Sequence, residues 1–355
     1  MSYRFDPRLS FASTIPSRYY TDPSFLAQEN RNVFGRTWQL VGHAEQARQP
    51  GQFFTARIAD EPLLIVRGSD GVLRAMSNVC RHRAGPVAEG QGKRPVLQCG
   101  YHGWTYSLDG TLMTTPEMEG IEKFDRAEFC LPQFRAELWN ELVFVNLSDD
   151  AVSLRDFLGP ELFDHLGKRD YSRHQLAGRK NWELDCNWKV YVDNYLEGYH
   201  IPIVHPSLFR ELDYPKYWTE TKGHYSIQHA PLKRADRIRA LSSDDDVSYY
   251  WVYPNLMLNV YPDNFSTNLI VPLGHERTLT IFEWYFRDPD APEVKKAIEE
   301  TIAFSDEIQL EDIDICEAVQ RGLRSTTYES GRYSPSRENG VHHFHGLYAE
   351  AMGLS

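Results

Sequence analysis

Two short segments of the chain each pair a cysteine with a histidine at a spacing that suits a metal centre. One residue separates Cys80 from His82, and two separate Cys99 from His102. Two thiolates and two imidazoles from adjacent loops can ligate a two-iron–two-sulfur cluster, with both cysteines on one iron and both histidines on the other. The alternative is a structural zinc site, but zinc sites usually place two cysteines together and two histidines together. The mixed pairs therefore favour the iron–sulfur cluster.

The residues around these ligands predict the tight turns that a cluster of this kind, a Rieske centre, requires. Gly85 and Pro86 follow the first pair, and small residues let backbone N–H groups approach the cluster. Residues 95–98 and 104–108 read as short strands on either side of the second pair. Asp109-Gly110 then gives a strong hairpin signal. We expect two ligand loops at the tips of hairpins in a small all-β module.

A second group of candidate ligands lies beyond the middle of the sequence. Residues 187–200 have the apolar period of a helix, and Glu197 and His200 fall on its polar face. Pro202 disfavours helix at the residue before it, so His200 is expected to end the helix and His205 to sit in the following turn. Two histidines so placed can converge on one metal ion. A water-facing polar stripe followed by a loop histidine is the alternative.

Asp312, in a long helix predicted over residues 292–322, helps to decide between a metal site and a water-facing stripe. Asp312 shares its helix face with mostly apolar residues, namely Ile308, Ile315, Cys316 and Val319. A carboxylate on such a face is costly to bury unless it is paired or bound to metal. Asp314, by contrast, shares a water-facing stripe with charged residues that include Glu311. His200, His205 and Asp312 then form a two-histidine, one-carboxylate triad, which leaves open positions on Fe(II).

Composition and length exclude several classes of protein. The 355 residues exceed one ordinary domain, and 41% apolar with 25% charged residues is typical of soluble globular proteins. No apolar run is long enough to span a membrane, and residues 1–8 lack the pattern of a signal peptide. The net charge of −12 argues against nucleic acid as a partner. Five scattered cysteines, two of them claimed as ligands, indicate a reducing cytoplasm rather than a disulfide framework.

The chain divides into two predicted domains. A β pattern runs from Leu40 to Leu147, and Ser148-Asp149-Asp150 marks a boundary. We expect a Rieske domain over residues 39–150, and a second, iron-binding domain built from residues 1–38 and 151–355. Strands mixed with long helices, without alternation of the two, predict an α+β fold in which helices flank an antiparallel sheet.

Both metal motifs, in this order, make the chain resemble the α subunit of a Rieske non-haem iron oxygenase. Glu197-Gly198-Tyr199-His200, followed by His205, matches the second motif of that family, and Glu311-Asp312 ahead of residues 317–320 matches its third ligand. The resemblance implies a 2Fe-2S cluster, a mononuclear Fe(II), and electrons that a flavin- and ferredoxin-type reductase delivers from NAD(P)H. It also implies a homotrimer, in which Glu197 links His102 of one subunit to His200 of another.

Within the family, the chain is most similar to the branch that acts on small quaternary ammonium compounds. Glu197, the segment Val252-Tyr253-Pro254-Asn255 and the C-terminal histidines at 342, 343 and 345 carry this resemblance. It implies that O2 is used to hydroxylate or N-demethylate a betaine-like substrate. Aromatic side chains of the second domain could form a cation–π cage for it, and the candidates are Tyr191, Trp251, Tyr253 and Phe265.

Two other functions remain open from the sequence. The first is the same oxygenase chemistry on an aromatic acid or methyl ether. The second is a Rieske electron carrier without an oxygenation site, which would need only about a hundred residues and would leave Asp312 on its apolar face unexplained. The histidines at 342, 343 and 345 are expected to pack or hydrogen-bond near a subunit contact, because the iron triad is complete without them.

Overall fold

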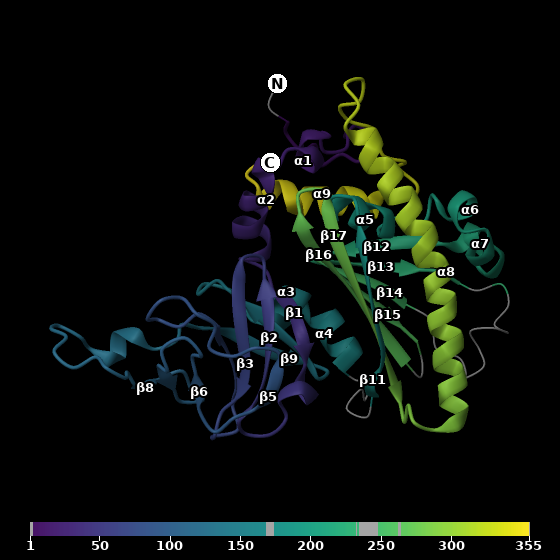
Figure 1. Ribbon diagram of the computed structural model, residues 1–355. Helices are drawn as coiled ribbons and strands as arrows, with labels where there is room; N and C mark the ends of the chain where they lie inside the picture. The colour runs from purple at the N-terminus through teal and green to yellow at the C-terminus, as the bar shows by residue number, and fades with distance from the viewer. Residues whose placement is uncertain (1–2, 168–173, 232, 234–247, 262–263, 355) are drawn as a thin grey trace. The chain divides into compact units, whose positions relative to one another are not determined.

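The described part of the chain forms two compact units. The computed structural model describes residues 3–167, 174–231, 233, 248–261 and 264–354. One unit, here the β unit, spans Phe34–Asp170, and the other, the α+β unit, combines Met1–Val33 with Tyr171–Ser355. Figure 1 shows strands throughout the β unit, and a second sheet with long helices in the α+β unit. The predicted fold class is confirmed.

The β unit is built on a twisted antiparallel sheet with a small three-stranded sheet beside the ligand loops. The large sheet has the order β1-β10-β9-β4-β3-β2-β5, and the small one the order β6-β7-β8. The strands are β1 (Gln39–His43), β2 (Gln52–Ile58), β3 (Glu61–Arg67), β4 (Leu73–Ser77), β5 (Gln91–Lys93), β6 (Leu97–Gln98), β7 (Thr105–Tyr106), β8 (Leu112–Thr114), β9 (Gln133–Trp139) and β10 (Leu142–Asn146).

The predicted hairpin after the second ligand pair is present. β7 pairs with β8, and Gly110 has a φ of 87° in the turn between them, a conformation that glycine adopts without steric cost. Cys80 and Cys99 belong to the buried core of this unit, together with Trp104 and Tyr106. The hydrophobic core of the β unit therefore extends up to the ligand loops.

The structure extends the β unit beyond the predicted boundary at Asp150. Helices α3 (Leu154–Leu158) and α4 (Pro160–Gly167) pack on it. The indole N–H of Trp139 donates to the carbonyl of Phe163 at 3.1 Å, and the amide of Asn140 donates to the carbonyl of Leu166 at 2.9 Å. These contacts tie α4 to the end of β9 and the turn that follows it, so α4 belongs to the β unit although it lies beyond the polar run.

The α+β unit is organised around an antiparallel sheet in the order β11-β17-β16-β15-β14-β13-β12. Its strands are β11 (His174–Leu184), β12 (Trp218–Lys222), β13 (Tyr225–His229), β14 (Ser248–Val252), β15 (Leu256–Val260), β16 (Asn264–Gly274) and β17 (Arg277–Arg287). The stretch Trp251 to Val260, which has the composition of one strand, is interrupted by a turn at residues 253–255 and forms parts of β14 and β15.

The α+β unit has seven α-helices among its described residues. They are α1 (Arg18–Thr21), α2 (Ser24–Glu29), α5 (Trp188–Tyr195), α6 (Ile201–Val204), α7 (Pro206–Glu211), α8 (Pro292–Leu323) and α9 (Asn339–Ala351). Of these, α5, α8 and α9 contact strands of the sheet. Figure 1 shows α8 running the length of the sheet. The amide of Gln309 on α8 donates to the hydroxyl of Thr280 on β17 at 3.1 Å, which fixes α8 against the strands. The predicted long helix is confirmed almost to the residue.

A fully buried ion pair joins α2 to α5. The ammonium of Lys189 lies 2.5 Å from a carboxylate oxygen of Glu29, and both side chains are almost wholly inaccessible, at 0% and 1% exposed. The indole of Trp188 and the hydroxyl of Tyr348 also donate to Glu29, both at 2.8 Å. Burial lowers the pKa of Lys189, and the charge of Glu29 opposes that shift. The pair connects the N-terminal segment, α5 and α9.

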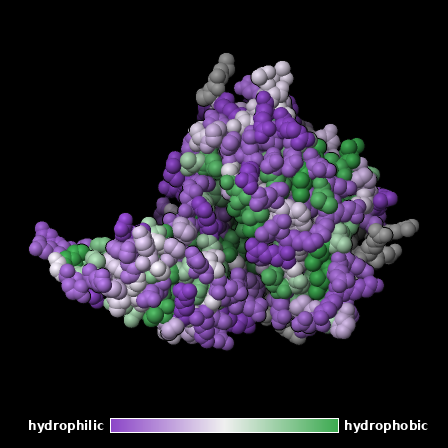
Figure 2. Space-filling model, viewed as in Figure 1, coloured by the Kyte–Doolittle hydropathy of each residue, from purple (hydrophilic) through white to green (hydrophobic). Residues whose placement is uncertain are grey.

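The surface of both units is mostly hydrophilic, as the composition predicts. Figure 2 also shows apolar patches on the visible face of the α+β unit. Its exposed apolar side chains include Ile203, at 84% exposed, and Leu310, at 57%. None of the described helices is both long and apolar enough to cross a bilayer.

The buried pair predicts a large loss of stability when one partner is removed. Glu29→Ala leaves the Lys189 ammonium uncompensated in the core, so we expect the free energy of unfolding to fall by about 3–5 kcal/mol. The control is Glu183→Ala, since Glu183 pairs with Arg277 on the surface and both are 60% exposed. It should change the free energy by less than about 0.5 kcal/mol. Urea unfolding followed by circular dichroism compares the two, and equal losses would contradict the assigned role of Glu29.

Candidate metal centres

The first candidate centre lies on two loops of the β unit. Cys80 follows β4, and a tight turn encloses the segment because the Cys80 N–H donates to Gly85 and the Ala84 N–H donates to Cys80, at 2.8 and 3.0 Å. The loop between β6 and β7 carries Cys99 and His102, and its turn closes when Gly103 N–H donates to the Cys99 carbonyl at 3.1 Å. Both turns form from local backbone bonds, as the short ligand spacings require.

The four predicted cluster ligands come together. The rings of His82 and His102 lie 4.6 Å apart between centroids. Cys80 and Cys99 are buried, at 3% and 2% exposed, and neither is in a disulfide. Burial raises the pKa of the Cys99 thiol; the neighbouring Cys80 adds to the shift, and backbone N–H groups of Tyr101 and His102 oppose it. Those N–H groups point at the sulfur and would stabilise a thiolate there.

The residues fit a cluster with cysteine and histidine ligands. Nδ1 of His82 is buried and has no hydrogen-bond partner among the described residues. A buried nitrogen without a partner is costly, unless it binds a metal such as the iron of a cluster. The ring of His82 stacks on Trp104 at 4.9 Å and 7°, which holds its plane. A Cβ at residue 85 would lie 3.2 Å from the Cys99 sulfur, so glycine allows the two loops to approach.

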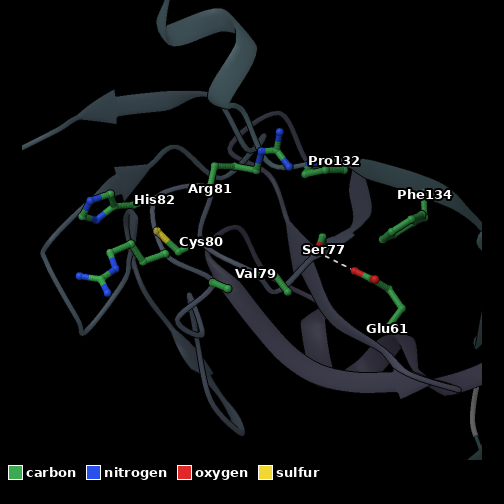
Figure 3. A pocket seen from close by; sticks show the side chains of 10 residues that line it. Glu61, Ser77, Val79, Cys80, Arg81, His82, Pro132 and Phe134 are labelled. Atoms are coloured by element: carbon green, nitrogen blue, oxygen red, sulfur yellow. Dashed lines mark hydrogen bonds between the residues drawn. The ribbon is translucent and has the colours of Figure 1, made fainter. Parts of the chain in front are cut away.

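An open cleft of about 540 Å³ runs beside the first ligand loop. Figure 3 shows Cys80 and His82 at one side of it and Phe134 at the other, with a hydrogen bond of 2.6 Å between Ser77 and Glu61. On the second loop, Tyr101 is 60% exposed. The cluster loops are therefore accessible from solvent although their thiols are buried.

The second candidate centre lies in the α+β unit and contains the predicted triad. The ligand atoms of His200, His205 and Asp312 all lie within 4.8 Å of one another, so these side chains could hold one metal ion. Nε2 of His205 is 3.0 Å from Oδ1 of Asp312, and Nε2 of His200 is 4.0 Å from the same oxygen. Two imidazoles and one carboxylate on one face of a metal ion form the donor set that suits Fe(II) and leave its other positions open.

Each of the three side chains has a further polar partner, and for the two histidines it lies on the ring nitrogen that faces away from Asp312. Nδ1 of His200 lies 2.6 Å from Glu197, and Nδ1 of His205 lies 2.6 Å from Glu311. The amide of Asn194 donates to Oδ1 of Asp312 at 2.6 Å. A carboxylate on Nδ1 fixes the tautomer in which Nε2 faces the metal and raises the basicity of the ring. The ring nitrogens are thus oriented before any metal binds.

The charges around His205 are strong enough to overcome its burial. Burial alone would lower the pKa of the ring, but hydrogen bonds and charges of Asp312 and Glu311 raise it above its ordinary value. A site that favours positive charge in this way also favours a divalent cation.

The helix that precedes His200 is shorter than predicted. α5 ends at Tyr195, and the chain then turns. The carboxylate of Glu197 accepts from the backbone N–H of Tyr199 and, at 3.1 Å, from that of His200, and so takes donors that a continuing helix would have used. Tyr199, which lies within the range predicted as a helix from its apolar period, is 59% exposed. Glu197 keeps its predicted hydrogen bond to the His200 ring all the same.

Sequence reasoning missed the role of Glu311 and misjudged part of α8. Glu311 was predicted to face water with Asp314, but it bonds to His205. Asp314 is exposed, as expected, while Val319, placed on the inward face, is 44% exposed. The signal that could have identified Glu311 is its position directly before a ligand, where it can reach a neighbouring metal-bound histidine.

The four predicted substrate residues lie in different surroundings. The Tyr191 hydroxyl donates to Gln309 on α8 at 2.5 Å, three residues before Asp312. Trp251 and Tyr253 pack with Phe344 of α9, at 5.5 and 6.4 Å between ring centroids. Phe265 stacks on Tyr285 at 4.6 Å. Of the four, the described contacts place only Tyr191 beside the helix turn that carries Asp312.

Family models match both units. Residues 37–125 match the Rieske [2Fe-2S] domain, and residues 172–354 match the ring hydroxylating alpha subunit (catalytic domain). The second match covers more than half of the chain. The chain belongs to the Rieske ring-hydroxylating oxygenases. It therefore carries sites for a 2Fe-2S cluster and for a mononuclear iron, and it is a Rieske non-haem iron monooxygenase.

Relatives match this oxygenase over nearly its whole length. The chloroplastic choline monooxygenase of Arabidopsis thaliana is 36% identical, over 99% of this chain and 86% of the relative. The carnitine monooxygenase oxygenase subunit of Escherichia coli K12 is 33% identical, over 96% of this chain and 94% of the relative. A solved structure of the quaternary ammonium Rieske monooxygenase CntA with L-carnitine is 30% identical, covers 97% of each chain and has a TM-score of 0.85.

Replacing the two aspartates of α8 distinguishes a ligand from a surface residue. Asp312→Ala should lose the mononuclear iron, so that the iron content falls from about three to about two per chain while the absorption of the cluster persists. Asp314→Ala should keep all of its iron, because an exposed helix position has little effect. Iron analysis with visible absorption measures both, and iron loss from Asp314→Ala alone would show that the ligand is misassigned.

Proposed function

We propose that this oxygenase hydroxylates, or oxidatively N-demethylates, a small quaternary ammonium compound. The observation that carries the proposal is the continuous likeness, over 96–99% of the chain, to enzymes whose names state choline or carnitine as the substrate. The matched range includes both metal motifs of this chain and Glu197. Naphthalene 1,2-dioxygenase of Rhodococcus, at 21% identity and a TM-score of 0.80, shares the fold alone.

The aromatic content of the α+β unit supports a cationic substrate. A quaternary ammonium has no N–H to donate, so a protein recognises it with aromatic faces and negative charge. Several half-buried tyrosines gather near the end of α5: the Tyr195 hydroxyl donates to Asn259 at 3.0 Å, and Tyr249 and Tyr261 lie 6.2 Å apart between ring centroids. Tyr191 lies near the charge of Asp312. We propose Tyr191 as a substrate-contacting residue.

We further propose how the residues hold the two centres. Cys80, His82, Cys99 and His102 ligate the cluster, and His200, His205 and Asp312 ligate the iron. When bound, the cluster supplies single electrons, and the mononuclear iron supplies the activation of O2 beside the substrate. The protein holds the ligand rings in fixed planes, through Trp104 under His82 and through Glu197 and Glu311 on the iron histidines.

The proposed reaction on an N-methyl group converts one C–H bond to C–OH. The resulting carbinolamine then loses its C–N bond, releases formaldehyde and leaves the demethylated amine. One oxygen atom of O2 enters the product and the other leaves as water, with two electrons from the reductase and two protons from solvent.

The oxygenase is one component of a system that includes a reductase, as the relation to an oxygenase subunit implies. We propose a flavin- and ferredoxin-type reductase that uses NAD(P)H, a homotrimer as the assembly, and the cytoplasm as the compartment. In the trimer, Glu197 would accept a hydrogen bond from His102 of the next subunit while it keeps His200. Electrons would then cross between subunits over a short bonded path.

A substrate screen tests the proposed function. Oxygenase loaded with cluster and iron is combined with a surrogate reductase, and NADH oxidation, O2 uptake and formaldehyde release are measured. We expect substrate-dependent turnover with choline, carnitine, γ-butyrobetaine or a related betaine, and none with benzoates or methoxybenzoates. Coupled turnover of an aromatic acid, with no response to any quaternary ammonium compound, would overturn the substrate class.

Glu197→Ala tests the proposed path between the centres. With Fe(II) in excess both metal sites should be loaded, since Glu197 is not itself a ligand, and the reductase should still reduce the cluster. Reoxidation of a pre-reduced cluster in the presence of O2 and substrate should slow by about 10- to 100-fold or more, as for other partners of metal-bound histidines. Single-turnover stopped flow measures it, and reoxidation at the wild-type rate would end the proposal that Glu197 is a bridge.

A further inference from the structure

The C-terminal histidines of the sequence occupy three different environments on α9. Nε2 of His342 lies 2.9 Å from the backbone oxygen of Asp6 in the N-terminal segment. His343 packs near Trp251, at 6.4 Å between ring centroids. His345 is 1% exposed and its ring contacts Asp193 on α5. The three residues therefore do not act as a group.

His345 is the centre of a buried hydrogen-bonded chain. Its Nδ1 lies 2.6 Å from the hydroxyl of Tyr333, and its Nε2 lies 2.9 Å from Oδ1 of Asp193 on α5. The hydroxyl of Tyr20, on α1, donates to Oδ2 of Asp193 at 2.6 Å. Tyr20, Tyr333 and His345 are almost wholly buried. The chain joins α1, α5, α9 and the segment before α9.

One proton arrangement satisfies every member of this chain. Tyr333 O–H donates to Nδ1 of a neutral His345, and the Nε2–H of the same ring donates to Asp193. Asp193 then accepts one bond on each oxygen, from His345 and from Tyr20. A buried polar chain with every group paired fixes its members in one geometry, whereas apolar side chains of similar size would pack with less directional preference.

The hydrogen-bonded chain fixes Asp193, which directly precedes Asn194, the residue that bonds to the iron ligand Asp312. Asp193 and Asn194 are successive on α5, so their side chains point about 100° apart around the helix. With Asp193 held by two donors, α5 cannot rotate, and the amide of Asn194 stays directed at Oδ1 of Asp312, 2.6 Å away. Gly340, at the start of α9, packs against Leu196 at the end of α5. A Cβ at residue 340 would overlap the carbonyl oxygen of Leu196.

We propose that His345 is a positioning residue for the mononuclear iron site. It acts through Asp193 and the rotation of α5, and so keeps the amide of Asn194 on Oδ1 of Asp312, the oxygen that lies nearest to Nε2 of both histidines. α9 is thus part of the iron site although none of its residues is a ligand. The inference rests on the iron site and not on the identity of the substrate.

Three variants in the hydrogen-bonded chain distinguish a positioning role of His345 from a role in packing alone. His345→Gln can keep an N–H close to Nε2 for Asp193, whereas His345→Phe keeps the ring volume and removes both polar contacts. Tyr20→Phe removes one donor to Asp193 and keeps its ring. The matched control is His342→Gln, on the same helix and partly buried, whose ring nitrogen bonds to the backbone of Asp6 rather than to α5.

The readouts need neither substrate nor reductase. Fe(II) is titrated into protein that holds the cluster but has been depleted of mononuclear iron, and the electron paramagnetic resonance of its nitric oxide complex is recorded. We expect His345→Phe and Tyr20→Phe to weaken Fe(II) binding about 3- to 10-fold, somewhat less than loss of a direct partner of a ligand, and to broaden the spectrum. His345→Gln and His342→Gln should resemble the wild type.

Wild-type Fe(II) affinity and an unchanged spectrum in both His345→Phe and Tyr20→Phe would overturn the inference, whatever their melting temperatures. If His345→Phe does not fold, Tyr20→Phe decides alone. An equal loss in His342→Gln would also overturn it, because α9 would then act only as a packing element. Failure of the substrate screen would leave this test unaffected, so the two proposals fail separately.

Discussion

The orientation of α5 is the constraint on which the iron site depends. This helix is only two turns long, yet it carries residues that face three separate partners. Lys189 is held by Glu29, Asp193 by Tyr20 and His345, and Asn194 contacts Asp312. A helix of eight residues has little stability of its own in water, so its position is determined by these contacts. Buried charged groups tolerate no misalignment, since each would then lose its partner at a cost of several kcal/mol.

Two prolines and one carboxylate position the two iron histidines in the segment after α5. Pro202 and Pro206 each stand in the first turn of a short helix, where the missing N–H costs nothing. His200 and His205 are the N-cap residues of those helices, so both project from turns whose backbone is fixed. Glu197 accepts from the backbone N–H groups of Tyr199 and His200, which follow α5 and do not bond within a helix. The spacing of four residues between the histidines thus equals one short helix.

The parts of the structure that sequence predicted well are those determined by local chemistry. The cluster ligands come from two turns closed by their own backbone bonds, and Asp109-Gly110 determines the hairpin beside them, so neighbouring residues suffice. The triad was also predicted, because a carboxylate on a mostly apolar face and two histidines around a helix end are recognisable types. The long helix over residues 292–322 follows from an apolar period that no glycine or proline interrupts until near its end.

What sequence could not predict depends on partners distant in the chain. Glu197 ends α5 early by competing for backbone N–H groups, which a periodic pattern over residues 187–200 does not reveal. The β unit includes α4 because α4 bonds to the end of β9 and the turn that follows it, whereas the polar run at 148–150 only resembles a boundary. Glu311 looked water-facing because its partner, His205, is more than a hundred residues away. The role of His345 likewise depends on Asp193, Tyr20 and Tyr333, which no local pattern connects to it.

The choice of outer partners also sets the charge of the iron site. Glu197 and Glu311 place negative charge behind the two histidines, where it strengthens them as donors, while Asp312 receives a neutral amide from Asn194. A lysine or arginine in place of Asn194 would neutralise Asp312 and compete with a divalent cation for its oxygens. An uncharged donor orients the carboxylate and leaves its charge to the metal. The same reasoning explains why α5 must also be held on its other side. The single hydrogen bond from the Asn194 amide to Asp312 is too weak to fix the helix. The charged contacts of Lys189 and Asp193 fix it instead, away from the metal.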